Sequence, residues 1–250
     1  MPKSFTRLDK LVVDRGLAPT RERAQALILA AKILVEGRPA TKAGQKVLES
    51  ADVRLTGEDL PYVSRGGLKL EHAIRTFGME LSGLTAMDVG ASTGGFTDCL
   101  LSFGARRVYA VDVGYGQLAL KLRNDPRVVV LERQNIRYLT RESIPEPVDI
   151  ATIDASFISL RLVIPAVANF LEPEAALVAL IKPQFEAGRE LVSKGAGVIR
   201  DPQIHDRACE AVCESTRSAG FHVLGVIPSP ILGPKGNREF LMSAVYLPKA

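Results

Sequence analysis

Two charged residues stand at the ends of apolar stretches of the sequence, where a charge is costly unless it is paired or used. Asp154 follows one apolar run and Lys182 follows another. An acid and a lysine in such positions can orient or deprotonate a bound hydroxyl, or they can form a structural salt bridge. Lys69 and Glu239 carry the same two charges near a predicted helix start and a predicted strand start. The four residues therefore predict acid–base chemistry at one rim of the fold, with a salt bridge as the alternative.

A glycine-rich turn predicts a ligand site. The sequence M-D-V-G-A-S-T-G-G-F contains Gly90, Gly94 and Gly95, which allow the backbone to approach a small molecule between a buried strand and a helix. Asp112 follows roughly 20 residues later, where a carboxylate can accept hydrogen bonds from ribose hydroxyls. Ser92 replaces the second glycine of the dinucleotide pattern, so a cofactor without a diphosphate fits better. Alternatively, the glycines serve only the geometry of a tight turn.

Alternating strand and helix signals predict the element that positions these residues. Such an alternation requires a mostly parallel sheet with helices on both faces, which brings strand ends together at one edge. The expected fold class is therefore α/β, a Rossmann-like domain, preceded by a small α+β unit. The predicted strands of the sheet are 85–89, 107–112, 128–131, 148–154, 175–181, 221–227 and 240–246.

Composition and charge favour a soluble protein that contacts nucleic acid. The longest apolar run, 175–181, is far shorter than the roughly 18 residues of a membrane span, and the N-terminus has no secretory leader, so cytoplasm is expected. Three cysteines match neither a zinc site nor a disulfide framework, so no metal is expected. Residues 1–60 hold eleven basic and eight acidic side chains, most of the net charge of +4. This bias predicts a nucleic-acid contact, with a merely solvated surface as the alternative.

The first 60 residues read as a small unit of two helices and short strands. Apolar spacing predicts one helix from Leu8, ended by Gly16, and a second helix capped by Thr20. Short strands are predicted near 33–35 and 53–55. Basic residues are scattered through the unit, which suits phosphate contacts better than base readout. The candidates for these contacts are Arg7, Lys10, Arg21, Arg38 and Lys42.

This unit resembles the S4-like RNA-binding domain. The resemblance rests on R-L-D-K-L-V-V-D-R-G-L-A-P-T-R-E-R-A-Q-A-L-I, followed by I-L-V-E-G. Ala31 departs from the pattern, because members usually carry glycine before the strand. The resemblance implies binding of structured RNA through its shape and phosphates.

From Ser64 to the C-terminus the chain resembles the TlyA, or haemolysin A-like, ribosomal RNA ribose methyltransferases, whose catalytic domain is similar to that of the FtsJ/RrmJ enzymes. The matching motifs are S-R-G-G-L-K-L at 64–70, D-V-G-A-S-T-G-G-F-T-D at 88–98, A-V-D-V-G-Y-G-Q-L at 110–118, D-A-S-F-I-S-L at 154–160, I-K-P-Q-F-E at 181–186, K-G-A-G-V-I-R-D-P at 194–202 and S-P-I-L-G-P-K-G-N-R-E-F-L at 229–241.

The resemblance implies methyl transfer from S-adenosylmethionine to a ribose 2'-hydroxyl of ribosomal RNA, at cytidines of the small or large subunit. It places Lys69, Asp154, Lys182 and Glu239 in the catalytic tetrad. We hypothesise that Lys182 is the base and that the two acids fix its geometry and charge.

We also expect cofactor and RNA contacts outside the tetrad. Gly90, Ser92 and Gly94 are expected at the methionine half of the cofactor, Asp112 at its ribose, and Asn135 with Phe96 near its adenine. Asp88 and Gly95 complete the cofactor candidates. Further RNA contacts are expected from Arg65, Lys194 and Arg200.

These inferences divide the chain into an RNA-binding domain at 1–59, a linker at 60–63 and a methyltransferase domain at 64–250. The expected partners are ribosomal RNA or ribosomal subunits, with no membrane, and a monomer is the default. The alternatives are a haemolysin-like lytic protein and a nonenzymatic RNA-binding factor of ribosome assembly. An NAD-linked dehydrogenase is disfavoured by Ser92. A base methyltransferase would not need two lysines and two acids in this arrangement.

Overall fold

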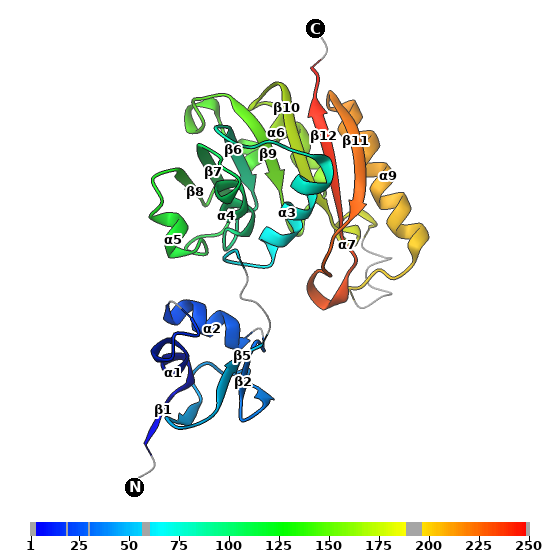
Figure 1. Ribbon diagram of the computed structural model, residues 1–250. Coiled ribbons are helices and arrows are strands. Elements are labelled where there is room, and N and C mark those ends of the chain that lie inside the picture. The colour runs from blue at the N-terminus through cyan, green and yellow to red at the C-terminus, as the bar shows by residue number, and fades with distance from the viewer. Residues whose placement is uncertain (1–3, 19, 30, 57–60, 189–196, 249–250) are drawn as a thin grey trace. The chain divides into compact units, whose positions relative to one another are not determined.

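The computed structural model describes residues 4–18, 20–29, 31–56, 61–188 and 197–248. The chain divides into two compact units, residues 1–60 and 61–250 (Figure 1). The predicted linker at 60–63 remains a prediction. Within it, Tyr62 is buried among the apolar side chains of the second unit, and its hydroxyl donates to Glu71 Oε2 at 3.0 Å.

The first unit packs two helices against short antiparallel strands. Leu8, Val12 and Ile28 are among its fully buried side chains, as the helical spacing predicts. Thr20 Oγ1 accepts a hydrogen bond from Arg23 N at 3.2 Å, which confirms the predicted cap of the second helix. The elements are β1 (Phe5–Arg7), α1 (Leu8–Asp14), α2 (Arg21–Leu29), β2 (Ile33–Val35), β3 (Arg38–Pro39), β4 (Lys46–Leu48) and β5 (Val53–Leu55).

Asp9 is a buried acid whose hydrogen bonds hold elements of the first unit together. Its carboxylate accepts hydrogen bonds from Arg7 Nη2 at 2.9 Å and from Arg21 Nε and Gln25 Nε2, each at 3.0 Å. The Arg7 guanidinium, joined by the Gln25 amide and the Arg21 guanidinium, holds the pKa of Asp9 well below its ordinary range. Asp9 therefore stays ionised and joins β1 to α1 and α2.

The second unit is built on a seven-stranded sheet in the order β11-β12-β10-β9-β6-β7-β8. The strands from β10 to β8 are parallel, whereas β12 pairs antiparallel with both β10 and β11. This topology confirms the predicted mostly parallel Rossmann-like sheet. The strands are β6 (Thr85–Val89), β7 (Arg107–Asp112), β8 (Val128–Glu132), β9 (Val148–Ile153), β10 (Leu171–Ile181), β11 (Phe221–Pro228) and β12 (Phe240–Tyr246).

Helices cover both faces of this sheet, as the alternation predicts (Figure 1). Alternate residues of β6 show the division: Ala86 belongs to the apolar cluster that includes residues of α3 and α4, whereas Met87 belongs to the cluster that includes residues of α6 and α9. The helices are α3 (Gly66–Phe77), α4 (Gly95–Ser102), α5 (Leu120–Arg123), α6 (Leu160–Ala168), α7 (Pro183–Glu186) and α9 (Pro202–Ser218), with 3₁₀ turns η1 (Ile136–Tyr138), η2 (Arg141–Ser143) and η3 (Pro234–Gly236).

The predicted strands are found, and the largest shift of a boundary is in the fifth of them. The strand predicted at 175–181 begins earlier, at Leu171, because Leu171 also pairs with Val148 of β9 across an irregularity in register. The helix α4 begins at Gly95, after Gly94 in a left-handed conformation as its N-cap. The helix start therefore lies directly against the glycine-rich turn.

The turn after α2 explains why glycine is common at position 31 in the S4-like pattern. Ala31 has a positive φ of 55°, and the chain closes the helix with Ala31 N–Ile28 O at 2.9 Å and Lys32 N–Leu27 O at 2.9 Å. This pairing is the Schellman motif, whose left-handed residue is normally glycine. An alanine there costs about 1–2 kcal/mol.

We therefore expect Ala31→Gly to stabilise the first unit by about 1 kcal/mol. Protection of the α2 amides against hydrogen exchange should rise about fivefold if these amides exchange by unfolding of the unit. Ala24→Gly, inside α2, is the control with the opposite sign, because glycine costs about 1 kcal/mol in a helix interior. Unchanged or reduced protection in Ala31→Gly would contradict the assigned strain.

Candidate active site

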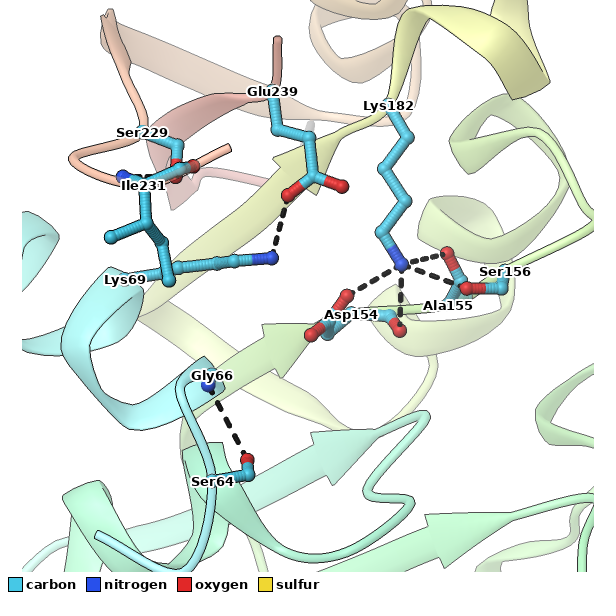
Figure 2. Close-up of polar contacts among 10 residues, drawn as sticks. All are labelled: Ser64, Gly66, Lys69, Asp154, Ala155, Ser156, Lys182, Ser229, Ile231 and Glu239. Carbon is cyan, nitrogen blue, oxygen red and sulfur yellow. Dashed lines mark hydrogen bonds and ion pairs between the residues drawn. The ribbon is translucent and has the colours of Figure 1, made fainter. Parts of the chain in front are cut away.

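Lys182 and Asp154 form one ion pair at the carboxyl edge of the sheet (Figure 2). Lys182 Nζ lies 2.6 Å from Asp154 Oδ1, and it donates to Ala155 O at 3.0 Å and to Ser156 Oγ at 2.9 Å. The two residues follow the adjacent parallel strands β10 and β9, which places them side by side. The predicted pair is thus brought together. Lys182 Nζ thus contacts three successive residues, Asp154, Ala155 and Ser156, and holds the start of the loop that follows β9.

Lys69 and Glu239 form a second, more deeply buried pair (Figure 2). Lys69 Nζ donates to Glu239 Oε2 at 2.6 Å, and the two residues are 8% and 2% exposed. Glu239 Oε1 is buried and has no hydrogen-bond partner among the described residues. The carboxylate packs against Gly233, where an added Cβ would lie 2.0 Å from Oε1. Glu239 therefore pairs with Lys69 and not, as hypothesised, with Lys182.

The start of α3 positions Lys69. Lys69 lies in the first turn of the helix, and Ser64 Oγ accepts from Gly66 N at 3.3 Å just before it (Figure 2). Beneath the helix, Gly67 leaves room for the Tyr62 ring, because a Cβ at Gly67 would lie 2.2 Å from that ring. The two glycines at the helix start thus allow α3 to sit close to its neighbours.

Two neighbouring cavities open along this edge of the sheet. The first encloses about 280 Å³ between the two ion pairs. Its lining includes Arg65, Lys69, Gly95, Phe96, Asp154, Lys182 and Gly233. The second encloses about 510 Å³ over the ends of β6, β7 and β9. Its lining includes Val111, Asp112, Gln117, Asn135, Ile136 and Phe157. Gly90, Ser92, Asp154 and Ser156 border both cavities, so a ligand in the second can reach toward the lysines in the first.

The second cavity has the features expected of a nucleoside site. Asp112 Oδ2 accepts from Ser92 N at 2.7 Å and Asp112 Oδ1 accepts from Gly114 N at 2.6 Å. The carboxylate is therefore fixed by the backbone, while its remaining lone pairs can accept hydrogen bonds from a diol. Apolar side chains such as Val111 and Ile136 line the space beside it. A mostly apolar cavity with a few fixed polar groups suits a ring with a sugar attached.

Four residues predicted to touch the cofactor do not line the nucleoside cavity. Gly94 borders neither cavity, since an added Cβ there would lie against Leu118 and Leu122. Gly95 and Phe96 line the first cavity and not the nucleoside cavity, because both stand in the first turn of α4, beside Gly66 of α3. The fourth residue is Asp88.

Asp88 is fully buried and borders neither cavity. Its oxygens accept from Thr97 Oγ1 of α4 at 2.7 Å and from Thr152 Oγ1 of the adjacent strand β9 at 3.2 Å. Burial raises the pKa of Asp88 to about 7, opposed by these hydrogen bonds and assisted by the charge of Asp154. Asp88 therefore has a structural role, because its hydrogen bonds hold the end of β6 in place just before the glycine-rich turn.

The RNA-binding candidates fall into three groups. Arg7 and Arg21 are half exposed, and their guanidinium groups are paired with Asp9. Lys10, Arg38, Lys42, Arg65 and Arg200 are exposed, and Arg65 also borders the first cavity. Lys194 lies outside the described residues. RNA contact by each of these side chains stays a prediction.

Two polar residues of the site were missed by sequence reasoning. Ser156 accepts from Lys182, and Gln117 Oε1 accepts from Ser92 Oγ at 3.2 Å. Both stand in the motifs given above, Ser156 two residues after Asp154 and Gln117 five residues after Asp112. Their positions just after strand ends are the signal that could have found them.

The described residues also bear on membrane and metal sites. No helix in the described part of the chain is both long and apolar enough to cross a membrane. Among the same residues, no group of three or more His, Cys, Asp or Glu side chains is placed to hold a metal ion.

Comparison with known proteins gives a consistent family. Residues 62–246 match the FtsJ-like methyltransferases and residues 6–53 match the S4 domain. The "Putative rRNA methyltransferase YqxC" of Bacillus subtilis is 47% identical, covering 97% of this chain and 86% of the relative. The 16S/23S rRNA (cytidine-2'-O)-methyltransferase TlyA of Mycobacterium tuberculosis is 46% identical, covering 94% and 88%. The solved structure of a "Putative hemolysin from Streptococcus thermophilus" aligns with a TM-score of 0.77 at 43% identity, covering 98% of this chain and 90% of that one.

The buried acid Asp88 generates a pH prediction. Its folded pKa of about 7 exceeds the unfolded value of about 3.9, so its contribution to stability is present below about pH 4 and is lost as pH rises to about 7. Between those pH values, wild-type stability should fall relative to that of Asp88→Asn by on the order of 2–4 kcal/mol. Urea unfolding of both proteins at a series of pH values measures this difference. Parallel pH profiles would show that Asp88 does not retain a proton in the fold.

Proposed function

Because this chain belongs to the FtsJ-like methyltransferase family and carries an S4 domain, we propose that it transfers a methyl group from S-adenosylmethionine to a ribose 2'-hydroxyl of ribosomal RNA. The observation that carries the proposal is the cavity between two lysine–acid pairs, which adjoins a nucleoside-shaped cavity. The activity for which the TlyA relative is named supports cytidine of the small and large subunits as the target. We place the protein in the cytoplasm, where ribosomal subunits are.

The residues around the second cavity fit the cofactor. Asp112 would hold the ribose diol, Asn135 and Ile136 would lie beside the adenine, and Gly90 with Ser92 would border the methionine half. S-adenosylmethionine supplies an activated methyl group on its sulfonium when it is bound. Since Gly90 and Ser92 border both cavities, they connect the cofactor site to the lysines. Positioning of this kind supplies much of the rate for an activated donor.

Lys182 is placed to take the proton of the attacking hydroxyl. In the ion pair with Asp154 the side chain is an ammonium, so one of its protons must leave to solvent before the hydroxyl arrives. The neutral amine would then accept the hydroxyl proton on its lone pair. Its two remaining N–H groups can stay on acceptors among Asp154 Oδ1, Ala155 O and Ser156 Oγ, each within 3.0 Å.

Lys69 acts on the same cavity as a fixed positive charge. Its ammonium lines the cavity with Lys182 and is held by Glu239 at 2.6 Å. A cation there stabilises negative charge that develops on the ribose oxygen as the proton leaves. Glu239 fixes the direction of the lysine and offsets the cost of burying its charge.

The first unit would bring the RNA. Arg7 and Arg21 are held by Asp9 with about half of each side chain exposed, so their remaining donors can reach phosphate oxygens. Lys10, Arg38 and Lys42 add exposed positive charge. We propose shape and phosphate recognition of folded ribosomal RNA by this surface.

The rivals to this proposal have weaker support. The Streptococcus thermophilus protein is called a hemolysin, but no described element is suited to spanning a membrane as a helix. A nonenzymatic RNA-binding role would leave both buried lysine–acid pairs without a use, and burying them is costly. The family membership replaces the dehydrogenase alternative with a methyltransferase.

Replacing Lys182 tests the proposed base. Lys182→Ala should lower methyl transfer to ribosomal subunits about 10²–10⁴-fold, because the proton acceptor is lost. Transfer of tritium from labelled S-adenosylmethionine measures the rate, and calorimetry should show unchanged cofactor affinity. Lys121→Ala is the control, since Lys121 pairs with Asp98 and lines neither cavity. Normal transfer by Lys182→Ala would remove this lysine from the mechanism.

Replacing Asp112 tests the cofactor site separately. Hydrogen bonds to a charged group contribute about 1.5–3 kcal/mol, so Asp112→Ala should weaken S-adenosylmethionine binding about 10–100-fold. Isothermal titration calorimetry measures the dissociation constant. Asp149→Ala is the control, because Asp149 lies at the start of β9, outside both cavities. Unchanged affinity in Asp112→Ala would place the cofactor ribose elsewhere.

A further inference from the structure

The side chain of Asn237 joins two motifs that are far apart in the sequence. Asn237 is 3% exposed. Its Oδ1 accepts from Ile199 N at 3.1 Å, and its Nδ2 donates to Gly197 O at 3.0 Å. The amide thus pairs with the backbone of 197–199 as a neighbouring strand would. Through these contacts, the loop between β11 and β12 is tied to the segment that leads into α9.

The same loop forms one wall of the first cavity and ends at Glu239. Ser229 N donates to Glu239 O at 2.9 Å and closes the loop at its base. Within it, Gly233 N donates to the backbone oxygen of Asn237 at 2.9 Å. Gly233 in turn lies against the Glu239 carboxylate and, with Ile231, lines the cavity. A shift of Asn237 would therefore be passed to the wall and to the acid.

The segment on the other side of Asn237 is itself fixed. Ile199 is 4% exposed, and its backbone oxygen lies 3.0 Å from Nε2 of the buried His205 in α9. The His205 ring also lies against Phe240, the first residue of β12, with ring centroids 5.6 Å apart. Asn237 is therefore anchored to an element that α9 holds in place.

We propose that Asn237 is a positioning residue for Glu239 and for the Ile231–Gly233 wall of the reaction cavity. It acts by fastening the β11–β12 loop to the 197–199 segment, which keeps the Glu239 carboxylate directed at Lys69. The carboxylate needs such support, because its Oε1 has no hydrogen-bond partner among the described residues. Outer contacts that orient the ligands of metal sites change activity 10–100-fold, and we expect an effect of the same order for this contact.

The cofactor cavity allows a local effect of the substitution to be distinguished from a general loss of folding. None of the residues from 229 to 239 lines the cavity that contains Asp112. Loss of the Asn237 amide should therefore leave cofactor binding alone while it disturbs the lysine–acid pair. A general loss of folding would instead lower both cofactor binding and transfer.

The first test measures methyl transfer by Asn237 variants, and it rests on the proposed function. In Asn237→Ala, kcat for methyl transfer to ribosomal subunits should fall about 10–100-fold, with KM for the subunits and the dissociation constant of S-adenosylmethionine unchanged. Asn237→Asp keeps the acceptor for Ile199 N but places a buried carboxylate oxygen opposite Gly197 O, so it should lower kcat at least as much as the alanine variant. Asn169→Ala, at an exposed asparagine after α6, is the matched control and should keep full activity.

Hydrogen exchange tests the same contact without any reaction. Relative to wild type, Asn237→Ala should exchange faster both in the 197–204 peptide and in the 229–240 peptide. If the alanine variant does not fold, both measurements are made on Asn237→Ser. A wild-type protein that transfers no methyl group would defeat the proposed function, and the exchange data would still decide whether Asn237 holds the loop.

Three results would overturn the proposal. The first is a kcat in Asn237→Ala equal to that of wild type. The second is a loss of cofactor affinity in parallel with kcat, which would mean a general structural defect. The third is faster exchange confined to 197–204, which would mean that the contact holds that segment and not the wall with Glu239.

Discussion

Two lysine–acid pairs at the carboxyl edge of the sheet, with Lys69, Lys182 and Glu239 buried, are the constraint on which the rest of the structure depends. A buried charge that loses its partner is strongly destabilising, so each member must be delivered to its partner accurately. Parallel pairing of β9 with β10 delivers Asp154 and Lys182, since both follow the ends of neighbouring strands. Lys69 comes from α3 and Glu239 from the start of β12, and their meeting requires α3 to pack against that strand. The charges therefore depend on the whole sheet being correctly assembled.

The two pairs differ in what surrounds them, and the difference suits different tasks. The Lys182 ammonium has several acceptors around it, from Asp154 to Ser156, so its charge is well satisfied. Glu239 has one lysine and an oxygen without a partner among the described residues. A fully satisfied ammonium is a good end state for proton uptake, whereas Glu239 lines neither cavity and acts only through Lys69. The asymmetry supports a proton acceptor in one pair and a fixed cation in the other.

Sequence reasoning predicted the sheet and the four charged residues, because strand ends in an alternating β–α pattern must meet at one edge. It could not predict which lysine pairs with which acid, since that depends on the packing of α3 against β12. It also misplaced Asp88. An acid one residue before the end of β6 alternates to the face covered by α4, whereas Asp112 at the last position of β7 reaches the cavity. The sequence also did not indicate that Arg7 and Arg21 share Asp9 as a partner, because Asp9 lies on a different element from Arg21.

Ser92 shows how a departure from a sequence pattern can have a second meaning. In the sequence, its replacement of glycine disfavours a diphosphate cofactor. In the structure Ser92 adopts a positive φ of 48°, a strained conformation for a residue with a side chain, and its N–H donates to Asp112 at 2.7 Å. Its hydroxyl donates in turn to Gln117 at 3.2 Å. The strained turn thus directs the Ser92 N–H toward Asp112, so the residue that disfavours a diphosphate also holds in place the carboxylate that we propose as the ribose contact.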